Sequence, residues 1–288
     1  MDDNIFIKSA TATAKIVAKA NVINEIINSD FLYSYIPSVE IFKCSNYKNE
    51  DAIVFIKKAT KDKINIFYPK AYYTFNVLNV YDIISFIEYI LERARQEKNV
   101  ICIHGAGCVM DNKLITCWGT ATGMGKTTLA LELSKNGNSF YSDEKILIDL
   151  KNNKAVGRIK NQYISNNYWK NKYGNLRYYE NENLFKEEMC DMSLFIQPII
   201  CNQQETVWDE WNDEKFFWHL YEESCRKIRG TSKTFFKRTC PVMSLDTFEL
   251  AQRRLKLIHD FTKINKAVYY KGDVKNAIKS IRTYLGSM

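Results

Sequence analysis

The sequence lacks several signals that mark special classes of protein. It has no run of about 18 apolar residues, so no membrane-spanning helix is expected. Its first residues carry no signal-peptide pattern, and no internal repeat or low-complexity tail is present. None of its 8 cysteines forms a Cys-x-x-Cys pair, so the spacing of a zinc ribbon is absent. Cys102 and Cys117 fall in apolar runs and are expected to be buried packing residues, whereas the role of Cys108 is left open. We therefore expect a soluble, cytoplasmic protein with reduced thiols and no membrane partner.

What is present describes an ordinary globular chain. Its 288 residues suffice for one large domain or two modest ones. Hydrophobic residues make up 46% of the chain and charged residues 26%, which is typical of a soluble protein. The 41 Lys and Arg residues against 33 Asp and Glu residues give a diffuse net charge of +8. Such a surface is compatible with an acidic peptide, a nucleotide or a nucleic acid and selects none of them.

Hydrophobic periodicity divides the chain near residue 80. Before that point, the pattern predicts one short helix and three short strands, at 21–29, 40–44, 52–57 and 63–67. The Ala- and Thr-rich stretch 9–20 fits either a helix or a strand. We therefore expect a small, mainly β N-terminal domain over residues 1–79 and a second domain over residues 80–288.

The second domain is predicted to mix helices with strands, which is typical of an α/β fold. It opens with a helix at 80–97, where Ile and Leu recur at helical spacing. The expected strands and hairpins lie at 100–104, 108–118, 139–144, 146–159, 193–200 and 267–270. The other expected helices lie at 127–135, 213–228, 246–262 and 273–285, with Asp246 as the expected N-cap of the third. The stretch 160–183, rich in Asn, Tyr and Lys, is interpreted as a long loop.

The most informative stretch runs from Gly119 to Leu133, between an apolar strand and an amphipathic helix. Residues 120–128 read Thr-Ala-Thr-Gly-Met-Gly-Lys-Thr-Thr, which is typical of a phosphate-binding P-loop. In such a loop, backbone N–H groups line an anion site, and the following helix directs its positive end at the phosphates. The residues predicted to bind the nucleotide are Thr122, Gly123, Met124, Gly125, Lys126, Thr127 and Thr128.

Within this loop, Lys126 is expected at the β- and γ-phosphates, and the hydroxyl of Thr127 on a Mg²⁺ ion. Thr120 stands where the usual pattern has glycine, and Gly119 lies one residue early. A residue other than glycine is tolerated at the loop entrance if its φ is negative. The alternative interpretation is a glycine-rich turn before an ordinary helix.

A P-loop site also needs an acid for the metal and a group that orients or deprotonates a nucleophile. Asp143 and Glu144 lie at the end of the predicted strand after the P-loop helix and are candidates for both roles. Asp143 is assigned to the metal with Thr127, although the sequence leaves open which acid is the base. His104, at the end of the strand 100–104, is a further catalytic candidate. A solvated acidic turn and a structural histidine are the alternatives. His219 and His259, on predicted helices, are interpreted as surface or core residues.

Taken together, these pieces resemble the catalytic domain of HPr kinase/phosphorylase and its relatives, which include peptide kinases. The P-loop also resembles that of phosphoenolpyruvate carboxykinase. The resemblance covers about residues 80–150: His104 matches the family's His-Gly step, residues 122–128 its P-loop, and Asp143 with Glu144 its Asp-Asp pair. Two departures are Thr120 for the first glycine and Glu144 for the second aspartate.

The resemblance implies a fold and an activity. The fold would be an α/β P-loop kinase core of the HPr-kinase/PEP-carboxykinase type, preceded by a small, mainly β N-terminal domain. The activity would be an ATP- and Mg²⁺-dependent kinase, with Lys126, Asp143, Glu144 and His104 as its catalytic residues. It would phosphorylate a hydroxyl, expected to be serine, on a protein or peptide acceptor, and a homo-oligomer is compatible with the family.

Two alternatives stay open on the same core. One is a small-molecule kinase or phosphotransferase, and the other is a nucleotide-binding regulatory module with weak catalysis. The second is indicated by Thr120 and by the lack of a clear copy of the family's downstream motif, for which Gly157-Arg158 and Arg229-Gly230 are candidates. Nucleic acid is not an expected partner, since neither a helicase signature nor a separate arginine finger is evident.

Overall fold

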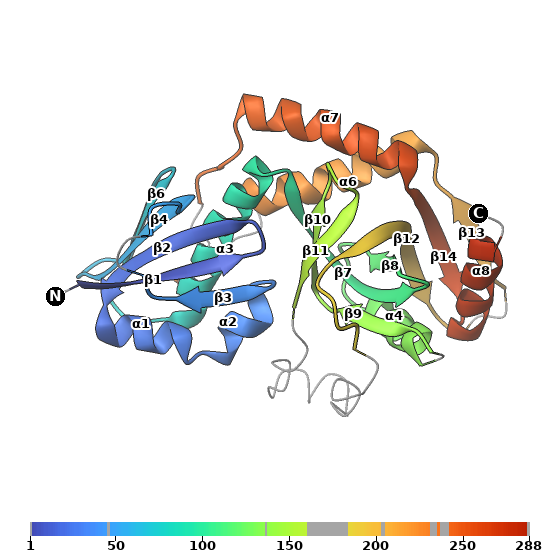
Figure 1. Ribbon diagram of the computed structural model, residues 1–288, viewed down its shortest axis with the longest axis horizontal. Coiled ribbons are helices and arrows are strands. Elements are labelled where there is room, and N and C mark those ends of the chain that lie inside the picture. The colour runs from blue at the N-terminus through green and yellow to red at the C-terminus, as the bar shows by residue number, and fades with distance from the viewer. Residues whose placement is uncertain are drawn as a thin grey trace. The chain divides into compact units, whose positions relative to one another are not determined.

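The computed structural model describes most of the chain as a mixed α/β protein with two mixed sheets and seven helices (Figure 1). The described residues are 2–44, 47–135, 137–159, 184–202, 205–230, 235–236 and 242–286. They form two compact units, one made of Met1–Ile101 with Ser224–Arg254 and the other of Cys102–Glu223 with Leu255–Met288. The predicted loop 160–183 lies outside the described residues.

The first unit is built on a six-stranded mixed sheet with the order β3-β1-β2-β4-β6-β5. The pairs β2–β4 and β4–β6 are parallel, and the other pairs are antiparallel. Its strands are β1 (Asp2–Ser9), β2 (Ala12–Lys19), β3 (Val39–Phe42), β4 (Ala52–Lys58), β5 (Lys63–Phe67) and β6 (Lys70–Phe75). Its helices include α1 (Ala20–Ile27), α2 (Asp30–Tyr35) and α3 (Val80–Glu97).

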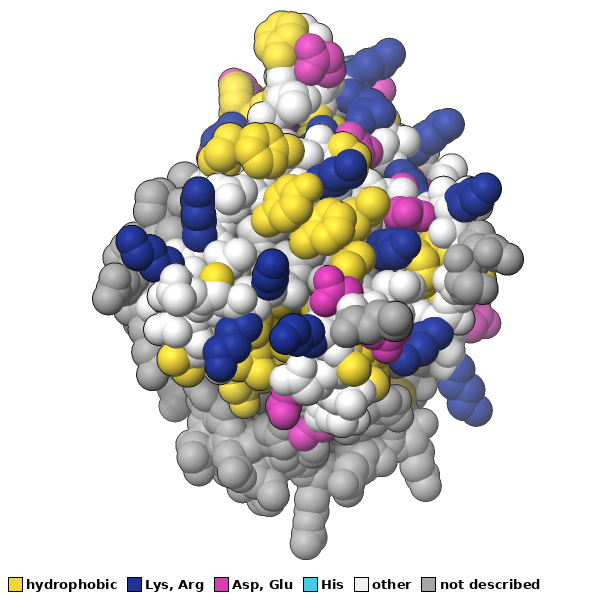
Figure 2. All heavy atoms as spheres, turned by 90° about the vertical axis from the view of Figure 1, so that its left-hand side faces the viewer, with side chains coloured by type: hydrophobic (Ala, Val, Ile, Leu, Met, Phe, Trp, Pro, Cys, Tyr) yellow, Lys and Arg dark blue, Asp and Glu magenta, His cyan; other side chains and the backbone are white. Residues whose placement is uncertain are grey.

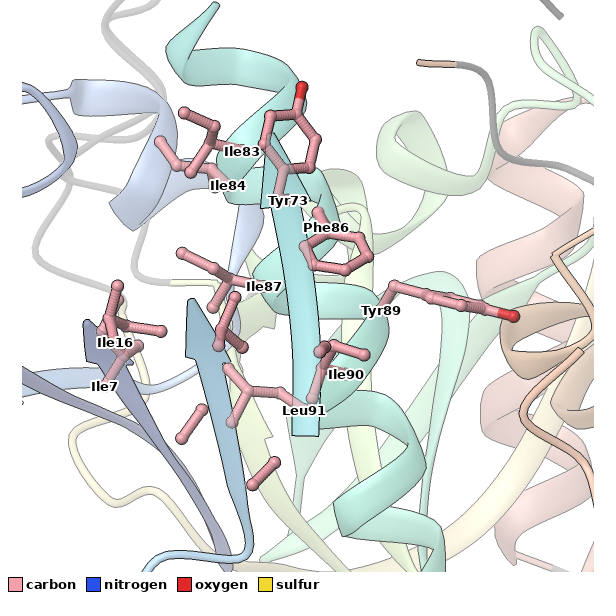
Figure 3. Packing of buried hydrophobic residues seen from close by; sticks show 14 of the residues in the cluster. Ile7, Ile16, Tyr73, Ile83, Ile84, Phe86, Ile87, Tyr89, Ile90 and Leu91 are labelled. Atoms are coloured by element: carbon pink, nitrogen blue, oxygen red, sulfur yellow. The ribbon is translucent and has the colours of Figure 1, made fainter. Parts of the chain in front are cut away.

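The three helices pack on one face of this sheet. Alternate strand residues such as Ile7 and Ile16 point toward α3, which presents Ile83, Ile87 and Leu91 to them (Figure 3). This alternation decides the undetermined stretch 9–20, which ends β1 and forms β2. Helix α3 was expected at the start of the second domain, whereas its contacts place it in the first unit, because its apolar face completes that unit's core.

Helix α3 also buries charge. The guanidinium of Arg95, 0% exposed, donates to Glu88 at 2.9 Å and to Glu92 at 2.8 Å. These two bonds come from Nη2, and Nη1 donates to the hydroxyl of Ser9 on β1 at 2.7 Å. Buried charges persist only when they are paired and hydrogen-bonded, and here both conditions are met. The network therefore fixes the helix against the sheet in one register.

The second unit contains an eight-stranded mixed sheet. Its main order is β11-β10-β7-β8-β12-β14-β13; β9 pairs with β7, and β11 also pairs with β12. Its strands are β7 (Val100–Met110), β8 (Lys113–Trp118), β9 (Ser139–Ser142), β10 (Lys145–Asp149), β11 (Lys154–Arg158), β12 (Cys190–Ile200), β13 (Val207–Glu210) and β14 (Lys266–Gly272). Strand β12 is parallel to both β8 and β14, so the carboxyl ends of these three strands share one edge.

Four helices complete the described elements: α4 (Lys126–Ser134), α6 (Asp213–Ile228), α7 (Phe248–Ile264) and α8 (Val274–Gly286). Helices α4 and α8 share a core, in which Leu129 and Leu133 lie with Ala277 and Ile281. Among the described residues, no helix combines the length and apolar character needed to cross a bilayer.

Most predicted elements are confirmed to within a few residues, and one predicted helix cap is wrong. Asp246 was expected to cap a helix starting at that residue, but α7 begins at Phe248. The hydroxyl of Thr247 accepts the N–H of Leu250, at 3.3 Å, as a cap does. The carboxylate of Asp246 instead pairs with Arg254 at 2.6 Å. The Asp246 carboxylate therefore binds the buried Arg254 guanidinium, a stronger charged partner than a backbone N–H of the helix.

Three cysteines, on β7 and β8, are buried packing residues rather than reactive groups. Cys102, Cys108 and Cys117 are buried thiols that form no disulfide. Burial raises the pKa of the Cys108 thiol to about 12, so this thiol stays protonated and unreactive at neutral pH. Cys108 is therefore a packing residue, as was expected for Cys102 and Cys117.

Replacing Tyr89 with phenylalanine should destabilise the first unit. The buried Tyr89 hydroxyl lies 2.7 Å from the Ile228 carbonyl oxygen and 2.8 Å from that of Met243. Without it, the carbonyl oxygen that accepts the hydroxyl proton loses this donor, so we expect the free energy of unfolding to fall by about 1–3 kcal/mol in urea titration. Tyr81→Phe is the matched control, since that side chain lies on the same helix and is 60% exposed. Equal losses in the two variants would contradict the assignment.

Candidate functional site

The chain between β8 and α4 forms a tight turn with glycines in the left-handed region. Gly123 has a φ of 85° and Gly125 a φ of 91°. Gly125 directly precedes α4, and a Cβ atom there would lie 2.5 Å from the Cγ1 atom of Ile200. Both the backbone conformation and the close approach of β12 therefore require glycine at 125.

The departure at Thr120 has little conformational consequence. Thr120 is a described residue, and its φ is not positive. Gly119, with a φ of 138°, supplies the unusual conformation one residue earlier. The condition set by the sequence, a negative φ at the loop entrance, is therefore met.

The first residues of α4 hold the turn together. The Lys126 ammonium group donates to the carbonyl oxygen of Ala121 at 2.8 Å, so its side chain spans the turn from end to start. The backbone N–H of Ile200 donates to the Met124 carbonyl at 2.9 Å, which ties the turn to the carboxyl end of β12. Thr122, Gly123 and Thr128 are exposed, so the outer surface of the turn is open to solvent.

A short hydrogen bond joins this turn to the predicted acidic pair. The Thr127 hydroxyl donates to Oδ1 of Asp143 at 2.8 Å. Asp143 is only 2% exposed and follows β9, which pairs with β7 in the same sheet. A hydroxyl and a carboxylate are hard oxygen donors of the type that Mg²⁺ prefers. The donors predicted for a metal site, 16 residues apart in the chain, are therefore adjacent in the fold.

Glu144 adopts a strained conformation that its neighbours enforce. Its φ is 67°, in the left-handed region, where residues other than glycine are uncommon. Its N–H donates to Oδ1 of Asp143 at 2.9 Å, and its carbonyl accepts the N–H of Gly105 at 3.3 Å. Strain of this kind costs about 1–3 kcal/mol and persists where surrounding bonds over-determine it.

His104 lies next to Glu144, as predicted for a shared site. Its Nδ1 atom is 3.1 Å from the carbonyl oxygen of Glu144 and 3.4 Å from Oε2 of the same residue. Because a carbonyl oxygen only accepts, Nδ1 carries the proton in the neutral ring. The Glu144 side chain is 38% exposed and that of His104 is 24% exposed. This pair is therefore accessible to a substrate, whereas Asp143 is not.

One buried acid beside this site was missed from the sequence. Oε1 of Glu223, a residue 5% exposed on α6, accepts the backbone N–H of His104 at 3.2 Å. Glu223 lies seven positions after Phe216 and three after Leu220, both of which are buried. A carboxylate on the apolar stripe of an amphipathic helix is the signal that could have identified it.

The two candidates for the missing downstream motif have other partners. The Arg158 guanidinium donates to the carbonyl oxygens of Tyr141 and Phe185, at 3.2 and 2.6 Å. Arg229 belongs to the first unit, with its Nε atom 3.9 Å from the Asp246 carboxylate. Of the other two histidines, His219 packs on Trp211 and His259 is exposed, in agreement with their interpretation as core or surface residues.

Comparison with family models gives no match to this chain, and none of the curated proteins searched matches its sequence. The site itself combines a glycine turn at a helix start, a lysine, a threonine–aspartate pair and a half-buried histidine–glutamate pair.

Substituting alanine at the two glycines of the turn should separate backbone strain from steric clash. Gly123→Ala introduces only a side chain at positive φ, since no atom lies within 4 Å of its Cβ position. Gly125→Ala adds the overlap with Ile200, so we expect it to lose about 1–3 kcal/mol more unfolding free energy. Urea titration of both variants measures the difference. Equal losses would mean that β12 does not pack on the turn as described.

Proposed function

We propose that this protein is an ATP- and Mg²⁺-dependent kinase that transfers a phosphoryl group to a hydroxyl, expected to be serine, of a protein or peptide. The observation that carries the proposal is the 2.8 Å hydrogen bond between Thr127 and Asp143 at the start of a helix preceded by a glycine turn. P-loop kinases and ATPases use a P-loop Ser or Thr together with an acid from another strand to hold the metal of a bound nucleotide.

The residues of the turn fit a triphosphate. The N-terminus of α4 presents backbone N–H groups and the positive end of the helix dipole, which favour anions. The Lys126 side chain already lies across the turn, where its ammonium group would neutralise phosphate charge. When bound, Mg²⁺ would supply further charge neutralisation, held by Thr127 and Asp143.

The different exposures of the two acids support different roles for them. Asp143 is buried and engaged with Thr127, so it serves the metal side of the site. Glu144 is exposed beside His104, so it is the acid that an acceptor hydroxyl can reach. As the acceptor oxygen bonds to the γ-phosphorus and the bond to ADP breaks, the hydroxyl proton passes to the Glu144 carboxylate. His104 orients that carboxylate, and Glu223 holds the backbone of His104.

A labelled-ATP assay with pools of serine-containing peptides and pools of metabolites tests this function. We expect phosphate in the peptide pool, and Lys126→Ala should lower the rate by about 100-fold or more, because one preorganised cation is lost. Lys135→Ala is the matched control, since that lysine lies at the other end of the same helix with its side chain 45% exposed. Label in metabolites alone would favour the small-molecule kinase. Tight ATP binding without turnover would favour the regulatory module.

Two substitutions at Thr127 test the metal assignment. Thr127→Ser keeps the hydroxyl, whereas Thr127→Val keeps the shape and removes it. We expect the valine variant to need about tenfold more Mg²⁺ for half-maximal activity, since a loss of roughly 1.4 kcal/mol in metal binding corresponds to a factor of ten. The serine variant should stay near the wild type in the same Mg²⁺ titration. Identical Mg²⁺ dependence in both variants would remove Thr127 from the metal site.

A further inference from the structure

The sheet of the first unit has a second face that α1, α2 and α3 leave uncovered. We call it the outer face; it carries the strand residues that alternate with the core positions. Among them, Val17, Ile53 and Phe55 are half-buried, whereas Tyr72 is 37% and Phe67 is 72% exposed. Contiguous exposed apolar side chains of this kind mark interaction sites more often than chance.

Strand register arranges this face in rows that run across the strands. The middle row contains Val17, Phe55 and Tyr72, which are direct partners on β2, β4 and β6. The rings of Phe55 and Tyr72 stack with centroids 4.9 Å apart and planes 11° apart. The middle row is therefore a continuous apolar strip across three neighbouring strands.

Lysines flank the strip on both sides. The row on one side contains Lys15 and Lys70 around Ile53, and the row on the other side contains Lys57 and Lys63. Among the described residues, these four lysines have no carboxylate within ion-pair distance. Figure 2 shows hydrophobic side chains in the middle of the view, with many Lys and Arg and fewer Asp and Glu side chains around them. An apolar strip between cationic rows is complementary to an anionic ligand with apolar groups.

Two observations favour a polypeptide over a single-stranded nucleic acid. The first arginine of the chain is Arg93, so the sheet carries only lysine, which lacks the planar fork used to read phosphates and bases. In addition, Phe55 and Tyr72 stack on each other, so two ring faces that bases would otherwise use are occupied.

We propose that the outer face binds an acidic segment of a polypeptide, whose apolar side chains lie on the strip and whose carboxylates meet the flanking lysines. The inference rests on the proposed function only in identifying this polypeptide as the phosphoryl acceptor. Recognition of the acceptor would then be separate from the residues that perform phosphoryl transfer.

Fluorescence anisotropy tests the proposal on the full chain without nucleotide. The probe is a labelled peptide of repeated Glu-Leu-Glu-Phe, about 12 residues long. At roughly 3.3 Å per residue, its extended length exceeds the combined width of β2, β4, β6 and β5, which carry the strip and its lysines. We expect saturable binding that weakens with salt. The double variant Lys57→Glu/Lys70→Glu should weaken binding about tenfold or more, because it reverses charge on both flanks. Lys275→Glu/Lys279→Glu, on exposed positions of α8, is the matched control.

The apolar contribution is tested with a matched pair of phenylalanines. Phe67→Ser should weaken peptide binding severalfold, whereas Phe248→Ser, at a side chain of nearly equal exposure, should not. No binding of the peptide, equal effects of the test and control variants, or tighter binding of a single-stranded oligouridylate of similar length would each overturn the proposal.

The outcome is independent of catalysis. Lys126→Ala should retain peptide binding, and the Lys57→Glu/Lys70→Glu variant should retain ATP binding. Loss of peptide binding in a chain that still transfers phosphate would reject the outer face alone. Peptide binding in a chain that never transfers phosphate would reject the kinase alone.

Discussion

The hydrogen bond between Thr127 and Asp143 is the interaction on which the candidate site depends. It joins the first turn of α4 to the residue after β9, and each end is fixed by its own structure. The turn is tied to β12 through Ile200, and β9 is paired with β7. A 2.8 Å bond between two such anchored groups leaves little freedom in either side chain. Preorganisation of this kind is what phosphoryl transfer asks of a protein, since the protein mainly positions groups and stabilises charge.

The strained residue Glu144 follows from the same constraint. Asp143 accepts bonds from both the Thr127 hydroxyl and the Glu144 N–H, so the chain must reverse immediately after it. The left-handed conformation at Glu144 accomplishes this, and Gly105 and His104 hold it in place through its carbonyl. As a result, two consecutive carboxylates have different surroundings, one buried and one exposed. We infer from this difference that one serves the metal and the other the acceptor hydroxyl.

The two faces of the sheet in the first unit differ in what they bury and what they expose. Its inner face is apolar except for the fully paired Arg95 network, whose partners lie on α3 and β1. Its outer face leaves apolar rings and lysines side by side in solvent. Because the core of the unit lies on the inner face, the residues of the outer face are available for recognition of a partner.

The sequence alone determined the local features. The helical spacing of Ile83, Ile87 and Leu91 predicted α3 with its bounds, because one face of a helix must be apolar to be buried. The glycine turn with Lys126 and Thr127 was also evident, since few other structures require those residue types in that order. Where periodicity was ambiguous, as at residues 9–20, the neighbouring strands decided the outcome.

Only the tertiary structure decided which distant residues meet. No spacing in the chain indicates that Asp143 bonds to Thr127, that Glu223 supports His104, or that Asp246 prefers Arg254 to a helix end. Likewise, the apolar strip between lysines exists only because the register aligns Val17, Phe55 and Tyr72. The physical reason is that periodicity and turn chemistry act over a few residues, whereas strand order and burial are set by competition among segments of the whole chain.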